Sequence, residues 1–218
     1  MTSRLNHEAA YRGQDPLCKL AKTRITVCGV GALGSNLVDS LTRMGGTSIR
    51  VIDKDKVEES NLCTQVYRTG DIGAFKTHAL RNYVFGATGV ELEVEARELD
   101  AKNVKKLLRG SELVVDCFDN SQARRIVTEH CRDQKIRLLH AGLSGDGYGA
   151  VQWDEFEDFR YKIPEDQPDD PCDLPLSRTL TVLVAIVAVE AVLVYAGGQL
   201  EHKGWTVTLG DLQIQPMR

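Results

Sequence analysis

Short apolar runs alternate along this chain with segments whose apolar residues recur at helical spacing. Residues 25–28 form a β-branched run, residues 36–44 place two leucines and Met44 on one helical face, and residues 49–52 form a second apolar run. Two consecutive glycines end the helical segment before that second run. The pattern predicts a strand, a helix and a second strand within about thirty residues.

The remainder of the chain continues this alternation. Helices are predicted over residues 75–83, 101–108 and 121–133, strands over 91–98, 113–117, 137–141 and 150–153, and a terminal hairpin over 205–215 that turns at Gly210 and Asp211. Residues 1–22 are predicted to be an N-terminal arm or helix, 56–69 a loop, and 142–149 a glycine-rich turn. We therefore expect an α/β, Rossmann-like domain over residues 23–218, with a mostly parallel sheet, helices on both faces and a C-terminal antiparallel hairpin.

The most apolar segment covers residues 179–196 and reaches the lower length limit of a membrane span. Glu190 interrupts it, and it occurs late in a chain that otherwise has the pattern of an α/β domain. A helix that is apolar on all sides is normally buried against other elements. We expect a buried or dimer-interface helix and no membrane partner.

Three glycines follow the first predicted strand in G-x-G-x-x-G spacing, at Gly29, Gly31 and Gly34. In such a turn two glycines let the backbone bend and approach a phosphate, and the third lets the helix pack closely on the strand. The helix that follows offers unpaired N–H groups to an anion. Asp53 ends the second strand, where a carboxylate can accept hydrogen bonds from a ribose. This stretch predicts a nucleotide-binding βαβ unit.

Further polar residues are expected at the same edge of the sheet, because ligands bind beyond the carboxyl ends of parallel strands. Asp116, Asp119 and Asn120 come at the end of a later strand, and Lys76 follows the loop after Asp53. An acid for ribose, an acid for magnesium and a lysine for phosphate form a set that suits a nucleoside triphosphate. Taken singly, Lys76 also fits a solvated helix, and Asp119 also fits an N-cap of the helix at residue 121.

The composition limits the kinds of partner and the cellular compartment that this protein can have. The chain has 218 residues, of which 42% are hydrophobic and 27% charged, and a net charge of -4 argues against a nucleic acid or an anionic membrane as the main partner. The six cysteines are scattered without a C-x-x-C pair, which indicates reduced thiols and a cytoplasmic protein. The first twenty residues are polar and do not resemble a signal peptide.

The motifs resemble those of the ThiF/MoeB/HesA family, the prokaryotic relatives of ubiquitin-activating enzymes. The matching stretches are GVGALG, DKDKVEESNLCTQ, DIGAFK and VVDCFDN, and the resemblance extends from about residue 25 to residue 198. Such proteins use ATP and Mg²⁺ to adenylate the C-terminal glycine carboxylate of a small ubiquitin-like or sulfur-carrier protein. They are usually dimers, so the resemblance implies a homodimer, with a heterodimer as the open alternative.

The resemblance also implies roles for individual residues in one nucleotide site. Gly29, Gly31, Ala32 and Gly34 would approach the nucleotide, Asp53 would hold the ribose, Asn61, Gln65 and Lys76 would lie at the phosphates, and Asp119 with Asn120 would support Mg²⁺ and the nucleotide. Lys76 and Asp119 are the residues expected to act in catalysis, because carboxylate attack on a phosphate brings negative charges together.

Two departures from the family pattern affect these expectations. The family's S-N-L-x-R-Q loop has an arginine where this chain has Thr64, and the loss of a phosphate-contacting arginine can cost several kcal/mol. Either Arg68 or an N-terminal arginine such as Arg12 of a second subunit replaces it, or adenylation is weak. The chain also lacks the two C-x-x-C pairs of many relatives, so no structural zinc is expected.

Cys172 lies in a proline-rich segment, within a crossover loop expected at about residues 154–178, just before the apolar helix. Relatives place there a cysteine that in some members becomes covalently linked to the carrier. An exposed loop suits a nucleophile that must reach an acyl-adenylate. Four nearby acids, Asp166, Asp169, Asp170 and Asp173, instead disfavour the thiolate. Covalent catalysis at Cys172 and an inert thiol both stay open.

The leading expectation is ATP-dependent adenylation of a carrier protein that ends in Gly-Gly, with transfer to Cys172 as an open second step. The alternative from a different class is a non-catalytic ThiF-like partner subunit that binds nucleotide or carrier protein, which Thr64 motivates. Adenylation of a non-protein carboxylate, such as a modified tRNA base, fits the acidic charge balance less well. Lys76 and the D-C-F-D-N stretch argue against an NAD-dependent oxidoreductase.

Overall fold

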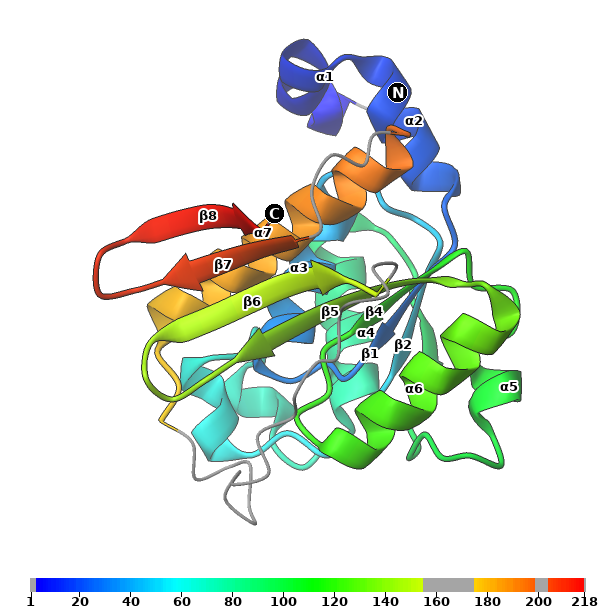
Figure 1. Cartoon of the computed structure of the whole chain (residues 1–218), viewed down its shortest axis with the longest axis vertical. Coiled ribbons are helices and arrows are strands. Elements are labelled where there is room, and N and C mark those ends of the chain that lie inside the picture. The colour runs from blue at the N-terminus through cyan, green and yellow to red at the C-terminus, as the bar shows by residue number, and fades with distance from the viewer. Residues whose placement is uncertain (1–2, 155–174, 199–203, 218) are drawn as a thin grey trace.

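The computed structural model describes residues 3–154, 175–198 and 204–217. Within these residues one eight-stranded sheet runs through the molecule in the order β3-β2-β1-β4-β5-β6-β7-β8 (Figure 1). The strands are β1 Ile25–Cys28, β2 Ile49–Ile52, β3 Glu93–Glu95, β4 Leu113–Asp116, β5 Arg137–Leu143, β6 Tyr148–Trp153, β7 Gly204–Thr208 and β8 Gln213–Met217. The first five are parallel to one another, and each of the last three is antiparallel to its preceding neighbour in this order. The prediction of a mostly parallel sheet with antiparallel C-terminal strands is confirmed.

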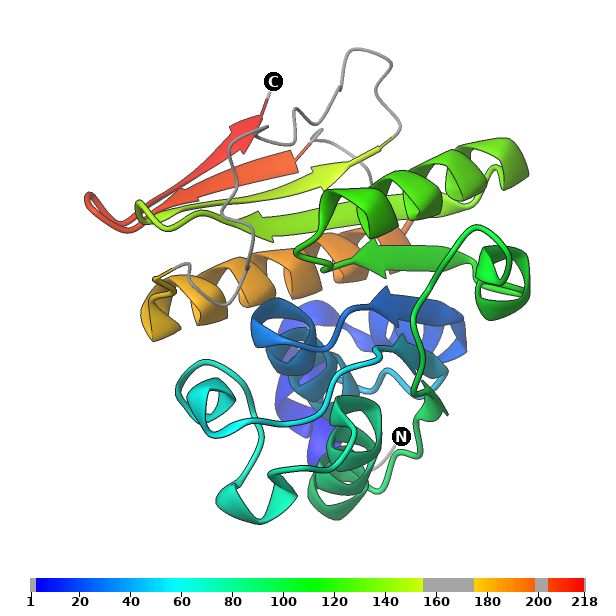
Figure 2. The same ribbon diagram turned by 90° about the horizontal axis from the view of Figure 1, so that it is seen from below.

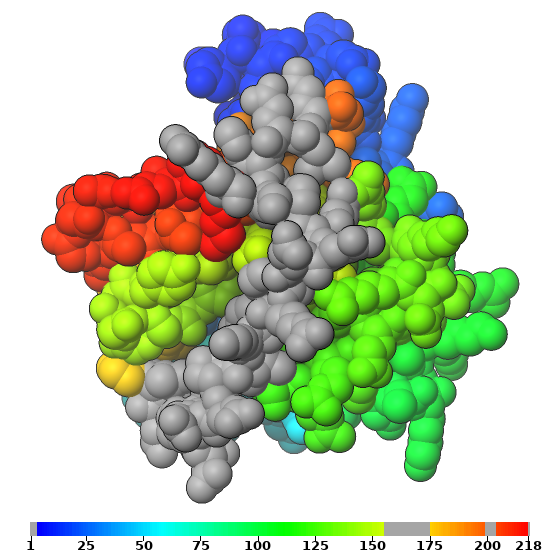
Figure 3. Space-filling model, viewed as in Figure 1, coloured from blue at the N-terminus to red at the C-terminus, as the bar shows by residue number. Residues whose placement is uncertain are grey.

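Helices cover both faces of the sheet (Figure 2). One face carries α3 Ala32–Arg43, α4 Lys76–Thr88 and α7 Arg178–Ala196, and the other carries α5 Val104–Leu107 and α6 Ser121–Gln134. Short 3-10 helices η1 Ser3–Leu5, η2 Glu59–Cys63 and η3 Thr69–Asp71 lie in the connections, and the N-terminal helices α1 Asn6–Arg12 and α2 Gln14–Lys22 precede β1. The N-terminal helices and the C-terminal hairpin β7–β8 form two projections of the molecule (Figure 3).

The strand sequences explain these two layers, because successive side chains on a strand point to opposite faces. Ile25 and Val27 pack into the core beneath α3 and α7, whereas Cys28 packs with Ile52 beneath α5 and α6. All four residues of β1 are buried, as expected for a central parallel strand covered on both sides. The central strands therefore fix the position of both helical layers.

The apolar helix α7 packs mainly against the antiparallel strands and against α3. Leu180, Val184 and Val192 are fully or almost fully buried, while Ile186 is 47% exposed. By length and composition alone α7 is the one helix of the described chain that is long and apolar enough to cross a membrane, but more than half of it is buried inside the fold. Burial within the fold explains its composition, as the sequence predicted.

α3 begins four residues before its predicted start and α4 ends five residues after its predicted end, and the structure differs from the predicted elements in three further places. β3 and α5 are only three and four residues long, because Asp100 accepts hydrogen bonds from the N–H groups of Lys102 and Asn103 and forms a turn in the predicted helix. The glycine-rich stretch is mostly strand, since β5 runs to Leu143 and β6 begins at Tyr148. A Cβ atom on Gly149 would lie 2.3 Å from a methyl carbon of Val184, so this glycine lets α7 approach the sheet.

Candidate functional site

The register of the parallel strands aligns the ends of β2, β1, β4 and β5. Ile52, Cys28, Asp116 and His140 lie side by side across the sheet. The residues that follow them therefore meet at the carboxyl edge of the sheet, which is where such folds bind ligands. A cavity of about 570 Å³ opens at this edge.

Most residues that the sequence singled out line this one cavity. Those that do are Gly29, Gly31, Ala32, Asp53, Asn61, Gln65, Lys76, Asp119 and Asn120. Gly34 is not among the lining residues, and Cys172 lies outside the described residues, as does most of the predicted crossover loop. The fold thus brings together residues as far apart in the chain as Gly29 and Asn120, partly through the strand register and partly through the connection from β2 to α4.

The three glycines have different structural roles. Gly29 has a φ angle of 85°, and a Cβ atom there would lie 2.9 Å from the carbonyl oxygen of Cys117. A Cβ atom on Gly34 would lie 1.9 Å from the carbonyl oxygen of Gly29, so Gly34 serves the packing of α3 on β1. Gly31 has no neighbour closer than the Gln65 amide nitrogen at 4.0 Å. Gly31 and Ala32 therefore present the N-terminus of α3 to the cavity, where unpaired N–H groups favour an anion such as phosphate.

Asp53 is a buried carboxylate that backbone groups hold in place. One oxygen accepts a hydrogen bond from the N–H of Val30 at 2.8 Å, and the other accepts one from the N–H of Asp55 at 2.8 Å. Burial raises the pKa of Asp53 above its ordinary value, although Lys76 and the two backbone hydrogen bonds act in the opposite direction. Each oxygen keeps a second lone pair, so the carboxylate can still accept hydrogen bonds from the hydroxyl groups of a ligand.

Lys76 begins α4 and is only 9% exposed. Its backbone N–H donates to the carbonyl oxygen of Asp55 at 2.9 Å, and its Nζ lies 3.4 Å from an Asp55 carboxylate oxygen. A lysine that is nearly buried in a cavity wall is costly unless it faces an anion. Asp55 provides such an anion, and the burial of Lys76 argues against a solvated surface lysine; the phosphate contact stays a prediction.

The turn after β4 carries Asp119 and Asn120. The Asn120 side chain accepts a hydrogen bond from the N–H of Ala123 at 2.8 Å and caps α6, so the alternative role of Asp119 as the N-cap is wrong. The Asp119 carboxylate is exposed at the cavity wall, where it can bind a cation. Asn120 has one side-chain oxygen committed to the cap, which leaves its amide nitrogen for a ligand.

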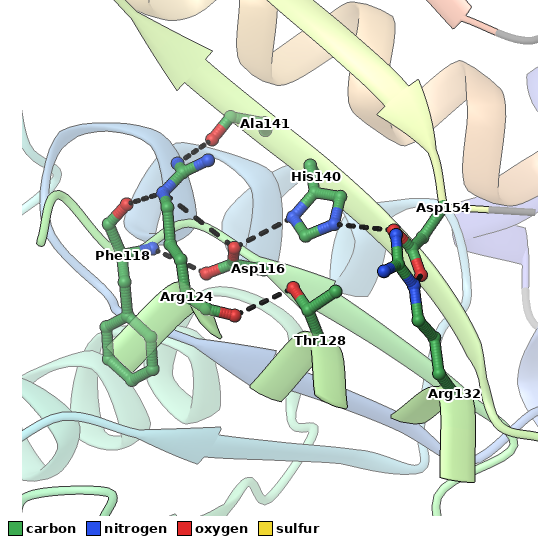
Figure 4. A network of polar contacts seen from close by, with 8 residues as sticks. All are labelled: Asp116, Phe118, Arg124, Thr128, Arg132, His140, Ala141 and Asp154. Carbon is green, nitrogen blue, oxygen red and sulfur yellow. Dashed lines mark hydrogen bonds and ion pairs between the residues drawn. The ribbon is translucent and has the colours of Figure 1, made fainter. Parts of the chain in front are cut away.

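Asp116, which the sequence grouped with these acids, does not line the cavity. It is fully buried behind the turn, where one oxygen accepts a hydrogen bond from the Phe118 N–H at 3.0 Å (Figure 4). The other oxygen lies 2.9 Å from Nδ1 of His140 and 3.8 Å from Nε of Arg124. Arg124 also donates to the carbonyl oxygens of Phe118 at 2.5 Å and Ala141 at 2.6 Å. Asp116 and Arg124 thus fix both backbone groups of Phe118 and hold the turn that presents Asp119.

The same network continues to the end of β6. Nε2 of His140 lies 3.6 Å from Oδ1 of Asp154. Arg132 donates one hydrogen bond of 2.7 Å to each carboxylate oxygen of Asp154 (Figure 4). Burial alone would lower the pKa of His140, but the hydrogen bonds to Asp116 and Asp154 outweigh it and raise that pKa above 6.5. Burial likewise opposes the charge of Asp116, yet Arg124 and His140 lower the pKa of that carboxyl group below its ordinary value. His140 is therefore a buried structural histidine whose protonated form the two carboxylates favour.

Thr64 lies in the cavity wall and is 9% exposed. Of the two arginines considered as replacements at this position, Arg68 lies with its guanidinium 5.1 Å from the centre of the Tyr83 ring, and Arg12 forms hydrogen bonds of 2.6 and 2.9 Å with Glu190. Neither lines the cavity of its own chain. Arg68 is therefore wrong as the replacement in this conformation, whereas a contact from a second subunit stays a prediction.

Several cavity residues escaped the sequence argument. They follow β2, β3 and β4 directly and comprise Lys54, Asp55, Arg97, Glu98, Leu99 and Phe118. Lys54 and Glu98 form an ion pair of 2.9 Å across the cavity rim. All of them follow the carboxyl ends of parallel strands, where ligands are expected to bind. The predicted end of β3 was three residues too late, so the residues from Arg97 to Leu99 were not recognised as following that strand.

Comparison with known proteins adds a family and a fold. A model described as the ThiF family matches residues 5–213. The SAMP-activating enzyme E1 of Haloferax volcanii is 36% identical over 169 residues, which cover 76% of this chain and 62% of that protein. The sulfur carrier protein ThiS adenylyltransferase of Bacillus subtilis is 31% identical over 162 residues, which cover 69% of this chain and 46% of that protein. The chain thus spans roughly half to three fifths of the length of these relatives.

Two solved structures share the whole fold. The complex of Escherichia coli MccB with MccA-N7isoASN superimposes with a TM-score of 0.84 at 16% identity, covering 100% of this chain and 72% of that one. The crystal structure of PaaA gives a TM-score of 0.81 at 19% identity, covering 100% and 74%. At these identities the likeness establishes the fold alone.

Proposed function

The chain belongs to the ThiF family, and on that premise we propose that it uses ATP to adenylate the C-terminal carboxylate of a small ubiquitin-like or sulfur-carrier protein. Two relatives are named for the activation of such proteins, SAMP and ThiS. The observation that carries the proposal is that Asp53, Lys76 and Asp119 line one cavity together with the N-terminus of α3.

The lining of the cavity suits the parts of ATP. The phosphates would lie at the N-terminus of α3 beside Lys76, and the ribose hydroxyl groups would donate to Asp53. The adenine ring would lie against Leu99, Phe118 and Ile126, which supply the apolar part of the wall. This placement leaves the α-phosphate between Lys76 and the turn that carries Asp119.

The proposed reaction needs no proton transfer. A carboxylate oxygen of the carrier protein attacks the α-phosphorus of ATP, the bond between that phosphorus and the bridging oxygen breaks, and pyrophosphate leaves. The barrier comes from bringing two anions together, so fixed positive charge at the phosphates lowers it. Lys76 would supply such charge, and Asp55 holds both its backbone N–H and its Nζ at the cavity wall.

Magnesium fits this site only together with the nucleotide. Within the residues that the structure describes, no group of three or more His, Cys, Asp or Glu side chains could hold a metal ion. Mg²⁺ bound with ATP is normally held by one or two carboxylates, by phosphate oxygens and by water, and Asp119 can provide a carboxylate. When bound there, the ion would neutralise charge on the phosphates.

A second step at Cys172 belongs to the proposal but has no structural support, since Cys172 lies outside the described residues. In that step the cysteine thiolate would attack the acyl carbon of the acyl-adenylate, the carbon–oxygen bond to AMP would break, and a thioester and AMP would form. Adenylation does not depend on this thiol, so Cys172→Ala should retain pyrophosphate exchange and lose only a thioester adduct.

ATP–pyrophosphate exchange by the purified chain tests the proposal, with and without small proteins that end in Gly-Gly. We expect exchange that depends on the carrier and falls at least about 100-fold in Lys76→Ala. Lys105→Ala is the matched control, because Lys105 is an exposed lysine of α5 outside the cavity. Equal loss in both variants would contradict the assignment of Lys76.

A non-catalytic partner subunit is the second candidate, and Thr64 in the cavity wall favours it. That function predicts ATP binding without exchange for any carrier when the chain is alone. It also predicts that exchange appears on addition of a separate catalytic subunit and survives Lys76→Ala in this chain.

A further inference from the structure

Arg178, the first residue of α7, reaches the wall of the cavity from outside. Its Nη1 donates a hydrogen bond to the carbonyl oxygen of Thr64 at 2.8 Å and another to Oδ1 of Asn36 at 3.2 Å. Arg178 does not itself line the cavity, whereas Thr64 does. The guanidinium therefore acts on the cavity through the backbone of Thr64.

Asn36 completes the junction. Its amide nitrogen donates to the carbonyl oxygen of Ala32 at 2.7 Å and to that of Thr64 at 2.8 Å. It is 7% exposed, and its oxygen is the group that accepts from Arg178. The junction of Arg178, Asn36, Thr64 and Ala32 thus ties α7, α3 and the η2 loop together at one point.

The junction lies at the half of the cavity that is proposed to hold the phosphates. Ala32 and Thr64 belong to the two segments that surround the proposed phosphate position, the N-terminus of α3 and the end of the η2 loop. Leu176, two residues before Arg178, lines the same cavity, so the start of α7 passes along this wall. The segments proposed to hold the adenine, at Leu99 and Phe118, have no bond to the junction among the described contacts.

The charge of Arg178 is also unusual for this neighbourhood. Lys54, Lys76 and Arg97 each have a carboxylate partner within 3.4 Å. No carboxylate within the described residues forms an ion pair with Arg178, whose positive charge is therefore set against neutral carbonyl and amide oxygens. A hydrogen bond from a charged donor is stronger than one between neutral groups, so this bond can fix the loop at Thr64.

We propose that Arg178 is a positioning residue for the phosphate half of the ATP site, which it holds in shape by clamping the Thr64 carbonyl onto α3. The proposal rests on the proposed use of ATP, and it makes the phosphate wall depend on the start of α7. Sequence comparison at Thr64 shows a missing arginine, whereas the structure places a guanidinium from another element against the same residue.

Binding of ATP and of adenosine by the full chain tests the clamp, because only ATP occupies the phosphate half. In Arg178→Gln we expect the dissociation constant for ATP to rise about tenfold while that for adenosine changes by less than about twofold. Arg178→Lys keeps a charged donor and should restore part of the ATP affinity. Arg125→Gln, an exposed arginine of α6 outside the cavity, is the matched control and should leave both constants unchanged.

Three outcomes would overturn the clamp. Unchanged ATP binding in Arg178→Gln would show that the wall does not need Arg178, and equal weakening of ATP and adenosine would show a general structural role. If Arg178→Gln does not fold, the same comparison is made with Arg178→Lys, and a loss of ATP affinity no larger than that of adenosine counts against the clamp. Failure of the proposed function is seen separately, as wild-type protein that binds ATP but catalyses no exchange.

Discussion

Asp53 and Asp116 are two buried carboxylates at the ends of β2 and β4, the two parallel strands that flank β1, and their surroundings differ. Backbone N–H groups hold Asp53, and burial raises its pKa. Side chains hold Asp116, and Arg124 with His140 lowers its pKa despite complete burial. The first carboxylate faces the cavity, whereas the second supports the turn that faces it.

The difference shows that one edge of the sheet carries residues that can bind a ligand and residues that hold the cavity wall in place. A carboxylate held by two backbone donors keeps lone pairs for a ligand, at the cost of incomplete charge compensation. The Asp116 carboxylate faces an arginine and a histidine and is completely buried, so it is not accessible to a ligand. The proposed ribose site therefore lies on the Asp53 side, and the rigid support of Asp119 lies on the Asp116 side.

Removing the charge of Asp116 should have the largest effect. Asp116→Asn leaves Arg124 and His140 buried without their shared carboxylate, and the free energy of unfolding should fall by about 3–5 kcal/mol. Urea denaturation measures the change. Asp133→Asn, at an exposed position of α6, is the control and should change stability by less than about 0.5 kcal/mol. A loss below about 1 kcal/mol in Asp116→Asn would mean that the network contributes little.

Removing the charge of Asp119 should lower the rate of pyrophosphate exchange without changing the free energy of unfolding. Asp119 is exposed and has no role in the Asp116 network, so Asp119→Asn should leave the unfolding free energy within about 0.5 kcal/mol of the wild-type value. Pyrophosphate exchange should fall about 100-fold, because a carboxylate near the proposed metal is lost. The exchange rate at saturating Mg²⁺ measures the effect, and normal exchange would disprove the metal assignment.

Asp53→Asn should cost less stability than Asp116→Asn. The amide oxygen can still accept one of the two backbone hydrogen bonds, and loss of the other should cost about 1 kcal/mol, partly offset because a neutral group is easier to bury. ATP affinity should nevertheless fall, since the amide accepts fewer hydrogen bonds from a ribose. Calorimetric titration with ATP measures the affinity, and urea denaturation measures the free energy of unfolding. A stability loss as large as that of Asp116→Asn would remove the distinction between the two sites.

The smallest expected effect is a difference in pH dependence. Because the pKa of folded His140 is raised above 6.5, its stabilising contribution is complete below pH 6.5 and is lost as the pH rises through the folded value. The Asp116 contribution is present above 3.8 and is lost as the pH falls through its lowered pKa. The pH dependence from Asp53 is opposite to that from Asp116. Because the pKa of Asp53 is raised, the free energy of unfolding increases as the pH falls through that pKa.

Urea denaturation at several pH values above and below 6.5 measures these contributions. The wild-type protein should lose stability above that value, and His140→Gln should lose the alkaline part of the dependence. The control is His130→Gln, at a partly exposed histidine of α6 outside the network, which should retain the wild-type profile. An unchanged profile in His140→Gln would mean that folding does not raise the pKa of His140.

The sequence alone determined the parallel half of the fold and many, but not all, of the residues that line the cavity. A β-branched run of four residues can hardly be anything but a central strand, and the carboxyl ends of parallel strands must meet, so Gly29, Asp53 and Asp119 could be predicted as neighbours. The sequence also placed Lys76 near the start of a helix, although that helix, α4, runs five residues beyond its predicted end. These features depend on residues close in the chain or on a rule that holds for every sheet of this kind.

Only the tertiary structure decided which polar residues support the site and which face a ligand. Asp116 and Asp119 are three residues apart, and nothing in their local sequence shows that one is buried under His140 while the other is exposed at the cavity. Arg178 likewise meets Thr64 across 114 residues. Such contacts depend on the distance and angle at which α7 packs on the sheet and on the register of β5 beside β4. Hydrophobic periodicity fixes which face of an element is buried, but it carries no information about which polar side chain lies opposite.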